Sequence, residues 1–210
     1  MANWCSTKYA FYTKDEDKGE LLRFYGSLIN VMKSPSAIPN DFGSGWLGNV
    51  LDRHGLDWEA VPCRGYISHI DDSPDENSFT IETEAAWEPV TALWEAVLAT
   101  YNGVSFVYVA EEPGNTVYIN TDTLGRFFPD RYLLDIFGDG QIPENWYPGQ
   151  DKPSYLDIRE YFNDFASLSD YCVEIMDKQF HSVAEIDAFL SDTFDGQSLI
   201  HANIHEFKTA

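Results

Sequence analysis

Three glycines, Gly43, Gly45 and Gly48, have the spacing of a dinucleotide-binding loop, in which glycines let a pyrophosphate approach a helix N-terminus. The sequence around them argues against that function. Pro39 and polar residues stand where a buried strand is required, and Trp46 occupies the loop that a phosphate would need. We therefore interpret the segment as a flexible glycine loop.

Four oxygen-bearing residues fall at positions 1, 3, 5 and 12 of a calcium-loop pattern: Asp71, Ser73, Asp75 and Glu82. The sixth position, where the loop needs glycine for a sharp turn, is Glu76, and Pro74 stiffens the segment. Strands rather than helices are predicted on both sides. A solvated acidic turn fits this sequence better than a calcium site.

Histidine and cysteine spacing gives no metal or nucleophile motif. His201 and His205 form an HxxxH pattern, but the surrounding residues predict a strand, on which residues four apart lie about 13 Å from each other. The cysteines are odd in number and include no CxxC pair: Cys5, Cys63 and Cys172. We expect no metal, no cofactor and no disulfide framework, and therefore a reducing compartment.

The charge balance bears on the class of partner. The 210 residues include 35 Asp and Glu against 13 Lys and Arg, a formal net charge of -22. Such a field repels nucleic-acid phosphates and anionic membranes. No apolar run has the length of a signal sequence or a membrane span. These observations predict a soluble cytoplasmic protein that does not bind nucleic acid or membranes directly.

The acidic residues are concentrated in one part of the chain. Between Arg64 and Arg126, 61 residues contain no Lys or Arg and include eleven acids. In Ser78 to Glu84 the apolar and polar residues alternate, which places Glu82 and Glu84 together on the solvent side of a strand. We predict an acidic, partner-binding face formed by Asp71, Asp72, Asp75, Glu76, Glu82, Glu84, Glu111 and Glu112.

Hydrophobic periodicity predicts the elements that position these acids. Strands are expected at residues 3–13, 64–70, 78–84, 104–110 and 116–121, and helices at 46–54 and 90–101. A further helix is expected after Thr13, capped by Thr13 with Glu16, with an apolar stripe of Leu21, Tyr25, Leu28 and Met32. This order predicts a ferredoxin-like (split βαβ) antiparallel sheet with its helices on one face.

Beyond residue 121 the pattern becomes irregular. Residues 122–153 are rich in Pro, Gly and aromatic residues and are interpreted as a connector with a short helix near 132–137. Residues 154–210 are expected to form a small α+β segment. It has strands at 155–161, 171–180 and 198–207, and a helix at 183–194 capped by Ser182 with Glu185. The predicted domain organisation is therefore 1–121, 122–153 and 154–210.

Two local motifs stand out in the first part of the chain. They are the opening residues Met1 to Ser6, MANWCS, and Thr83 to Pro89, TEAAWEP, which is followed by a hairpin around EEPGN. Both resemble motifs of the YubB-type family of phages, plasmids and other mobile elements. The sequence departs from the family pattern at Thr7 to Tyr9. The resemblance covers residues 1–121 and implies a ferredoxin-like fold, and the family carries no established activity.

Three functional hypotheses follow. The first is a non-enzymatic protein of a mobile genetic element that binds a basic protein partner, such as a nucleic-acid-binding protein whose ligand it mimics or a host system that it antagonises. The second is a soluble domain whose charge serves only solubility. The third is an enzyme whose site is not visible from motifs. The absence of any catalytic motif favours a non-enzymatic role, and the sequence leaves the oligomeric state open.

Overall fold

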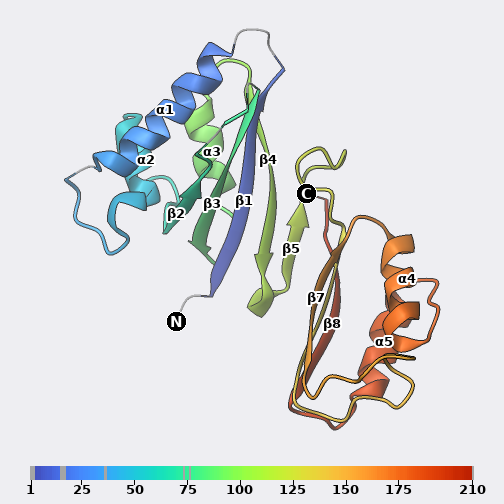
Figure 1. The fold of residues 1–210 in the computed structure, drawn as a ribbon. Helices are drawn as coiled ribbons and strands as arrows, with labels where there is room; N and C mark the ends of the chain where they lie inside the picture. The colour runs from blue at the N-terminus through green and yellow to red at the C-terminus, as the bar shows by residue number, and fades with distance from the viewer. Residues whose placement is uncertain (1–2, 15–17, 36, 73, 76, 210) are drawn as a thin grey trace. The chain divides into compact units, whose positions relative to one another are not determined.

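The computed structural model describes residues 3–14, 18–35, 37–72, 74–75 and 77–209. The chain has an α+β fold with two antiparallel sheets (Figure 1). It divides into two compact units, Met1–Asp122 and Thr123–Thr209, and each is described by itself.

The first unit is built on a sheet with strand order β2-β3-β1-β4-β5, in which every neighbouring pair is antiparallel. The predicted strands and helices of this unit are present, with boundaries that differ by a few residues. Its elements are β1 (Trp4–Thr13), α1 (Gly19–Lys33), η1 (Gly43–Gly45), α2 (Leu47–Arg53), β2 (Gly65–Ile70), β3 (Ser78–Ala86), α3 (Thr91–Leu98), β4 (Val104–Glu112), η2 (Pro113–Asn115) and β5 (Val117–Asn120).

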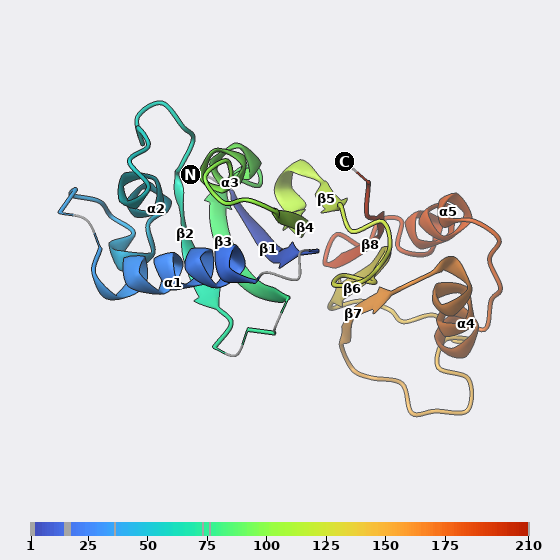
Figure 2. The ribbon, with the colours of Figure 1, turned by 90° about the horizontal axis from the view of Figure 1, so that it is seen from above.

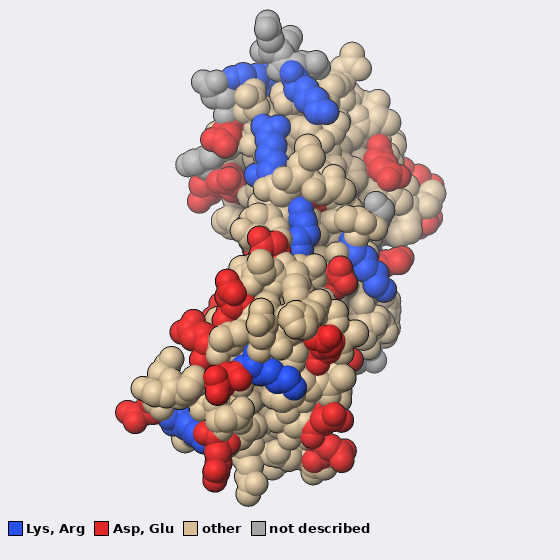
Figure 3. Space-filling view, turned by 90° about the vertical axis from the view of Figure 1, so that its right-hand side faces the viewer, with Lys and Arg blue, Asp and Glu red and all other residues tan. Residues whose placement is uncertain are grey.

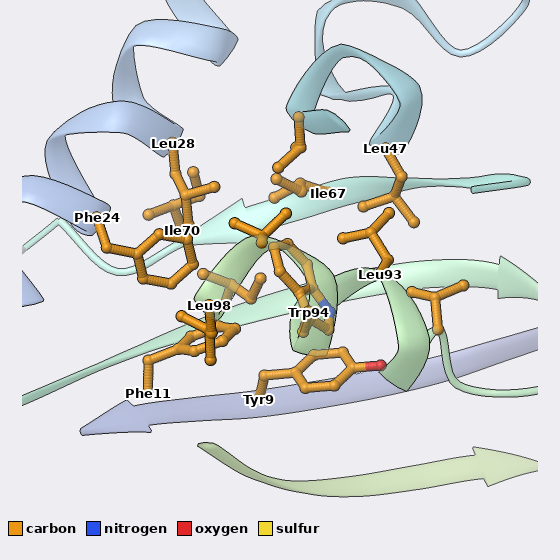
Figure 4. Close-up of a cluster of buried hydrophobic side chains, with 14 of the residues drawn as sticks. Tyr9, Phe11, Phe24, Leu28, Leu47, Ile67, Ile70, Leu93, Trp94 and Leu98 are labelled. Atoms are coloured by element: carbon orange, nitrogen blue, oxygen red, sulfur yellow. The ribbon is translucent and has the colours of Figure 1, made fainter. Parts of the chain in front are cut away.

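Helices α1 and α3 pack on the same face of this sheet. The ring of Phe11 on β1 lies 4.9 Å from Phe24 of α1 and 5.3 Å from Trp94 of α3, measured between ring centroids. Figure 4 shows the side chains of the three helices and of β1 and β2 pointing toward one another. Leu28 and Trp94 are fully buried there, as the sequence predicts.

Helix α1 begins later than the sequence predicts. Its N-cap is Lys18, with no side-chain cap, whereas Thr13 still belongs to β1, so the predicted capping role of Thr13 is wrong. Glu16 lies outside the described residues. The buried residues of the helix are Leu21, Phe24, Leu28 and Val31. Leu21 and Leu28 are therefore buried as predicted, whereas Phe24 and Val31 take the places predicted for Tyr25 and Met32, which are half-buried.

The second unit contains a three-stranded sheet of order β7-β6-β8, with both pairs antiparallel. Two helices lie on one side of it (Figure 1 and Figure 2). A core that includes Leu134, Trp146, Cys172 and Ile186 fills the space between them. The elements are β6 (Tyr132–Gly138), β7 (Leu156–Phe162), α4 (Phe165–Met176), α5 (Val183–Thr193) and β8 (Ile200–Glu206).

Two secondary-structure predictions for this unit are wrong. Residues 132–137 form strand β6 rather than a helix, and this strand is the centre of the second sheet although it lies in the segment interpreted as a connector. Residues 171–176 belong to helix α4 rather than to a strand. Asp164 caps that helix by accepting a hydrogen bond from the Ser167 N–H at 2.8 Å. An Asp at this position is a sequence signal for a helix start, but the apolar and β-branched residues that follow it favoured a strand.

Candidate functional site

The side of the first sheet that faces away from the helices carries the candidate site. Along β1, Cys5, Thr7 and Tyr9 point into the helix-covered core, whereas Ser6 and Lys8 alternate with them and are exposed. We call the second side the outer face and define it by Trp4, Ser6, Lys8, Tyr66, Glu82, Glu84 and Glu111.

Glu84 and Glu111 flank the same residue on the outer face. Ser6 pairs with Glu84 of β3 on one side and with Glu111 of β4 on the other. Two strand spacings separate the two glutamates, which corresponds to about 10 Å between their Cα atoms. The Glu84 carboxylate makes no hydrogen bond or ion pair with the described residues. This carboxylate is therefore available to a cation from outside the chain.

Lys8 interrupts the acidic character of this face. Its Nζ atom lies 3.4 Å from Oε1 of Glu82, and both side chains are about half exposed, at 46% and 45%. An exposed pair of this kind contributes at most about 1 kcal/mol to stability. In the view of Figure 3, Asp and Glu form separate groups with Lys, Arg and uncharged surface between them. On that side the acids do not form one continuous stripe.

The predicted acids of the β2–β3 turn lie away from Glu84 and Glu111. Asp72 and Asp75 are exposed, and the half-buried Asp71 accepts a hydrogen bond from the Tyr25 hydroxyl at its backbone carbonyl, at 2.9 Å. Glu76 lies outside the described residues. The turn precedes β3, and Glu84 lies six residues after the first residue of that strand, or about 20 Å along it. The structure therefore places these acids in a separate group.

Glu112 is not part of the outer face. Its side chain is 2% exposed and accepts hydrogen bonds from the backbone N–H groups of Gly114 and Asn115, at 2.9 and 2.6 Å. This arrangement caps the short η2 turn in the β4–β5 hairpin. The carboxylate is committed to the fold, and a partner cannot reach it without opening the turn.

An aromatic cluster next to Glu84 was not predicted. The ring of Trp4 lies 6.0 Å from Phe42 and 6.1 Å from Tyr66, and Phe42 stacks on Tyr66 at 6.1 Å. Trp4 is 42% exposed, and Tyr66 pairs with Glu84 in the sheet register. The alternation of residues 4–9 in β1 puts Trp4 on the polar side, and this sequence signal could have indicated an exposed aromatic residue here.

The glycine loop has no room for a phosphate. Trp46 is buried, and a Cβ atom at Gly48 would lie on its indole ring. At Gly45 a Cβ atom would lie 2.6 Å from the carbonyl oxygen of Ile67. These glycines allow the loop to approach Trp46 and β2 closely, and this requirement accounts for the motif without a ligand.

The cysteines and histidines form no reactive centre among the described residues. All three thiols are free and buried, and burial raises the pKa of Cys5 to about 11 and that of Cys172 to about 12. His201 and His205 lie on β8, as the sequence predicts. No group of three or more His, Cys, Asp or Glu side chains in the described part of the chain is placed to hold a metal ion.

Comparisons with protein-family models, with curated proteins and with solved structures found no match. Among the described helices, none has both the length and the apolar character that crossing a membrane requires.

Proposed function

We propose that the first unit has a ferredoxin-like fold with one added strand, β5, and that the chain is related to the YubB-type proteins of mobile elements. The strand order β2-β3-β1-β4 with antiparallel neighbours supports the fold, as does the packing of α1 and α3 on one face. The kinship rests on the MANWCS and TEAAWEP motifs. A cytoplasmic location is part of the same proposal.

The proposed function is binding of a basic protein partner through the outer face. The observation that carries it is the row formed by the paired residues Tyr66, Glu84, Ser6 and Glu111 across four neighbouring strands, with Trp4 beside it. This row presents half-buried carboxylate side chains beside the half-buried ring of Tyr66 and the exposed ring of Trp4. The net charge of -22 would attract a basic surface toward it.

Arginine is the side chain that this arrangement fits best. Its guanidinium group donates several N–H bonds to carboxylates and also stacks on aromatic faces, whereas the lysine ammonium is a compact point charge. Glu84 lies between the aromatic cluster and Ser6, so one guanidinium could contact both a ring and a carboxylate. The proposed partner is therefore a basic segment that contains arginine, such as the surface of a nucleic-acid-binding protein.

The position of Lys8 argues against binding that depends on acidic charge along the whole outer face. Because Lys8 pairs with Glu82 beside this row, the outer face does not present the unbroken charge of a nucleic-acid backbone. Binding of a few arginine side chains fits the face better than mimicry along its whole length. Two alternatives to partner binding remain. One is that the charge serves only solubility, and the other is that the chain is an enzyme with an unrecognised site.

The proposal is tested with a fluorescent arginine-rich peptide and a lysine-rich peptide of equal charge, whose affinities are measured by anisotropy at low and physiological salt. We expect the arginine peptide to bind more tightly and to lose affinity as salt rises, since exposed ion pairs are screened over about 8 Å at physiological ionic strength. The Glu84→Lys/Glu111→Lys variant should bind at least about tenfold more weakly.

The matched control is Asp72→Lys/Asp75→Lys, which changes the net charge equally at the β2–β3 turn. It should weaken binding much less. An equal loss in both variants would mean that only net charge matters, as the solubility interpretation holds. If the lysine peptide bound as tightly as the arginine peptide, the aromatic rings beside Glu84 would not contribute to the affinity, and this part of the proposal would be wrong.

A further inference from the structure

A second feature of the first unit is a cavity of about 360 Å³ beside the N-terminal end of α3. Val117 and Ile119 of β5 form part of an apolar wall, and the polar or charged residues that line it are Arg64, Glu88, Thr91 and Tyr108. A mostly apolar cavity with a few convergent polar groups, at about 300 to 1,000 Å³, is the usual form of a small-molecule site.

Hydrogen-bond donors of α3 lie at this cavity. The helix begins at Thr91 with Val90 as its N-cap and has no side-chain cap. The N–H groups of Thr91 and Ala92, both residues of the cavity wall, have no acceptor among the described residues. Unsatisfied N–H groups and the helix dipole make such an end favourable for a negative charge.

Tyr108 supplies an independent donor. Its side chain is 8% exposed and lines the cavity, and its hydroxyl makes no hydrogen bond with the described residues. Burial raises the pKa of Tyr108, so the phenol keeps its proton at neutral pH and can donate it. Because no described residue accepts a hydrogen bond from this hydroxyl, an anionic group in the cavity could accept one.

Arg64 supplies a positive charge at the cavity. It is exposed, it forms no ion pair with the described residues, and its backbone carbonyl is held by the Ala86 N–H at 3.0 Å. Glu88 also lines the cavity without pairing with Arg64. It follows Trp87, whose φ of 75° lies in the left-handed region that aromatic residues rarely adopt. An anion would therefore be attracted at Arg64 and the helix end, and repelled at Glu88.

We propose that this cavity binds a small amphiphilic anion: a carboxylate or phosphate group held by Arg64, the first N–H groups of α3 and the Tyr108 hydroxyl, with an apolar body against Val117 and Ile119. The site lies on the helix-covered side of the sheet and is distinct from the outer face. It does not depend on the function proposed above.

The test is a titration of the full chain, followed by the amide resonances of Thr91 and Ala92 in NMR spectra. Hexanoate and phenyl phosphate are the carboxylate and phosphate probes, and hexanol, phenol and inorganic phosphate are the comparisons. We expect saturable shifts with one or both amphiphilic anions, and weaker binding of each comparison.

Three variants test the polar groups. Arg64→Gln should weaken anion binding about tenfold or more, because it removes charge-assisted hydrogen bonds. Glu88→Gln should strengthen it, since the opposing charge is removed. Ala92→Asp places an acid at the start of α3, where it favours the helix but repels the anion. Arg53→Gln, an exposed arginine of α2, is the control and should leave binding unchanged.

The opposite effects of Arg64→Gln and Glu88→Gln are the decisive result, because a general loss of structure would change both in the same direction. Several outcomes would overturn the proposal. The first is an absence of saturable shifts with both anions. The second is a comparison compound that binds as tightly as its anion: hexanol as tightly as hexanoate, phenol as tightly as phenyl phosphate, or inorganic phosphate as tightly as phenyl phosphate. The third is an anion affinity that does not change in Arg64→Gln and Ala92→Asp.

Discussion

The buried thiols illustrate how a residue's surroundings decide its chemistry. Cys5 lies in the core of the first unit and Cys172 in that of the second, and no charged group offsets the loss of hydration. Burial raises the thiol pKa in each case, so neither residue is a nucleophile near neutral pH. The sequence showed that no partner motif accompanies them, but their depth in the two cores follows only from the fold.

These thiols predict how stability depends on pH. An unfolded thiol ionises near pH 9, whereas the folded pKa values are about 11 for Cys5 and about 12 for Cys172. The unfolded state therefore loses protons first, and the stabilisation present below pH 9 should be lost as the pH rises from 9 through these folded values. Urea unfolding at pH 8 and pH 10 measures this. Cys172→Ala should reduce the dependence on pH, and an unchanged slope would contradict it.

The surroundings of Glu112 likewise decide the role of its carboxylate. Two adjacent acids before Pro-Gly-Asn predict exposed charge, yet Glu111 and Glu112 have opposite roles because they lie on opposite faces of β4. Pro113 begins the η2 turn and Glu112 caps it. Alternation along the strand and the capping signature could both have been recognised in the sequence.

At the level of elements, local patterns identified helix α5 of the second unit but not strand β6. Ser182 and Glu185 form the predicted capping box of α5, in which the Glu185 N–H donates to the Ser182 hydroxyl at 3.3 Å. The His181 N–H in turn donates to the Glu185 carboxylate at 2.8 Å. By contrast, residues 133–136 of β6 are all buried, including Asp135, which pairs with Arg159. A short segment that is buried on both faces lacks the alternation that distinguishes a strand from a helix.

The packing of α3 on the sheet predicts a specific cost. Trp94 is fully buried and contacts both Tyr9 and Phe11, so Trp94→Ala should lower the free energy of unfolding by about 3 to 5 kcal/mol. Denaturant unfolding followed by circular dichroism measures the change. Trp87→Ala, at a residue that is 45% exposed, is the control and should cost far less. Equal losses would mean that α3 does not anchor this core.

The candidate site depends on information that is not local in the sequence. The alternation of β3 predicted that Glu82 and Glu84 face solvent, and both lie on the outer face. The register that places Glu111 across Ser6 from Glu84 joins strands from separate parts of the chain. The aromatic cluster likewise combines residues 4, 42 and 66, which no local pattern connects.

For the whole molecule, the net charge of -22 alone does not specify a partner. On the side shown in Figure 3 the acids form separate groups, which favours a site defined by the local arrangement of residues rather than by total charge. The outer face meets this condition because Glu84 pairs with Tyr66, whose ring contacts the exposed ring of Trp4. A partner attracted by the overall field would then be recognised at this row.

The most direct measurement is the footprint of the arginine-rich peptide on the full chain, recorded from backbone amide and tryptophan indole resonances during titration. We expect the largest shifts at Ser6, Glu84 and Glu111 and at the Trp4 indole, and we expect them to disappear in Glu84→Lys/Glu111→Lys. Shifts confined to the β2–β3 turn, or spread evenly over the acidic residues of both units, would contradict binding at the outer face.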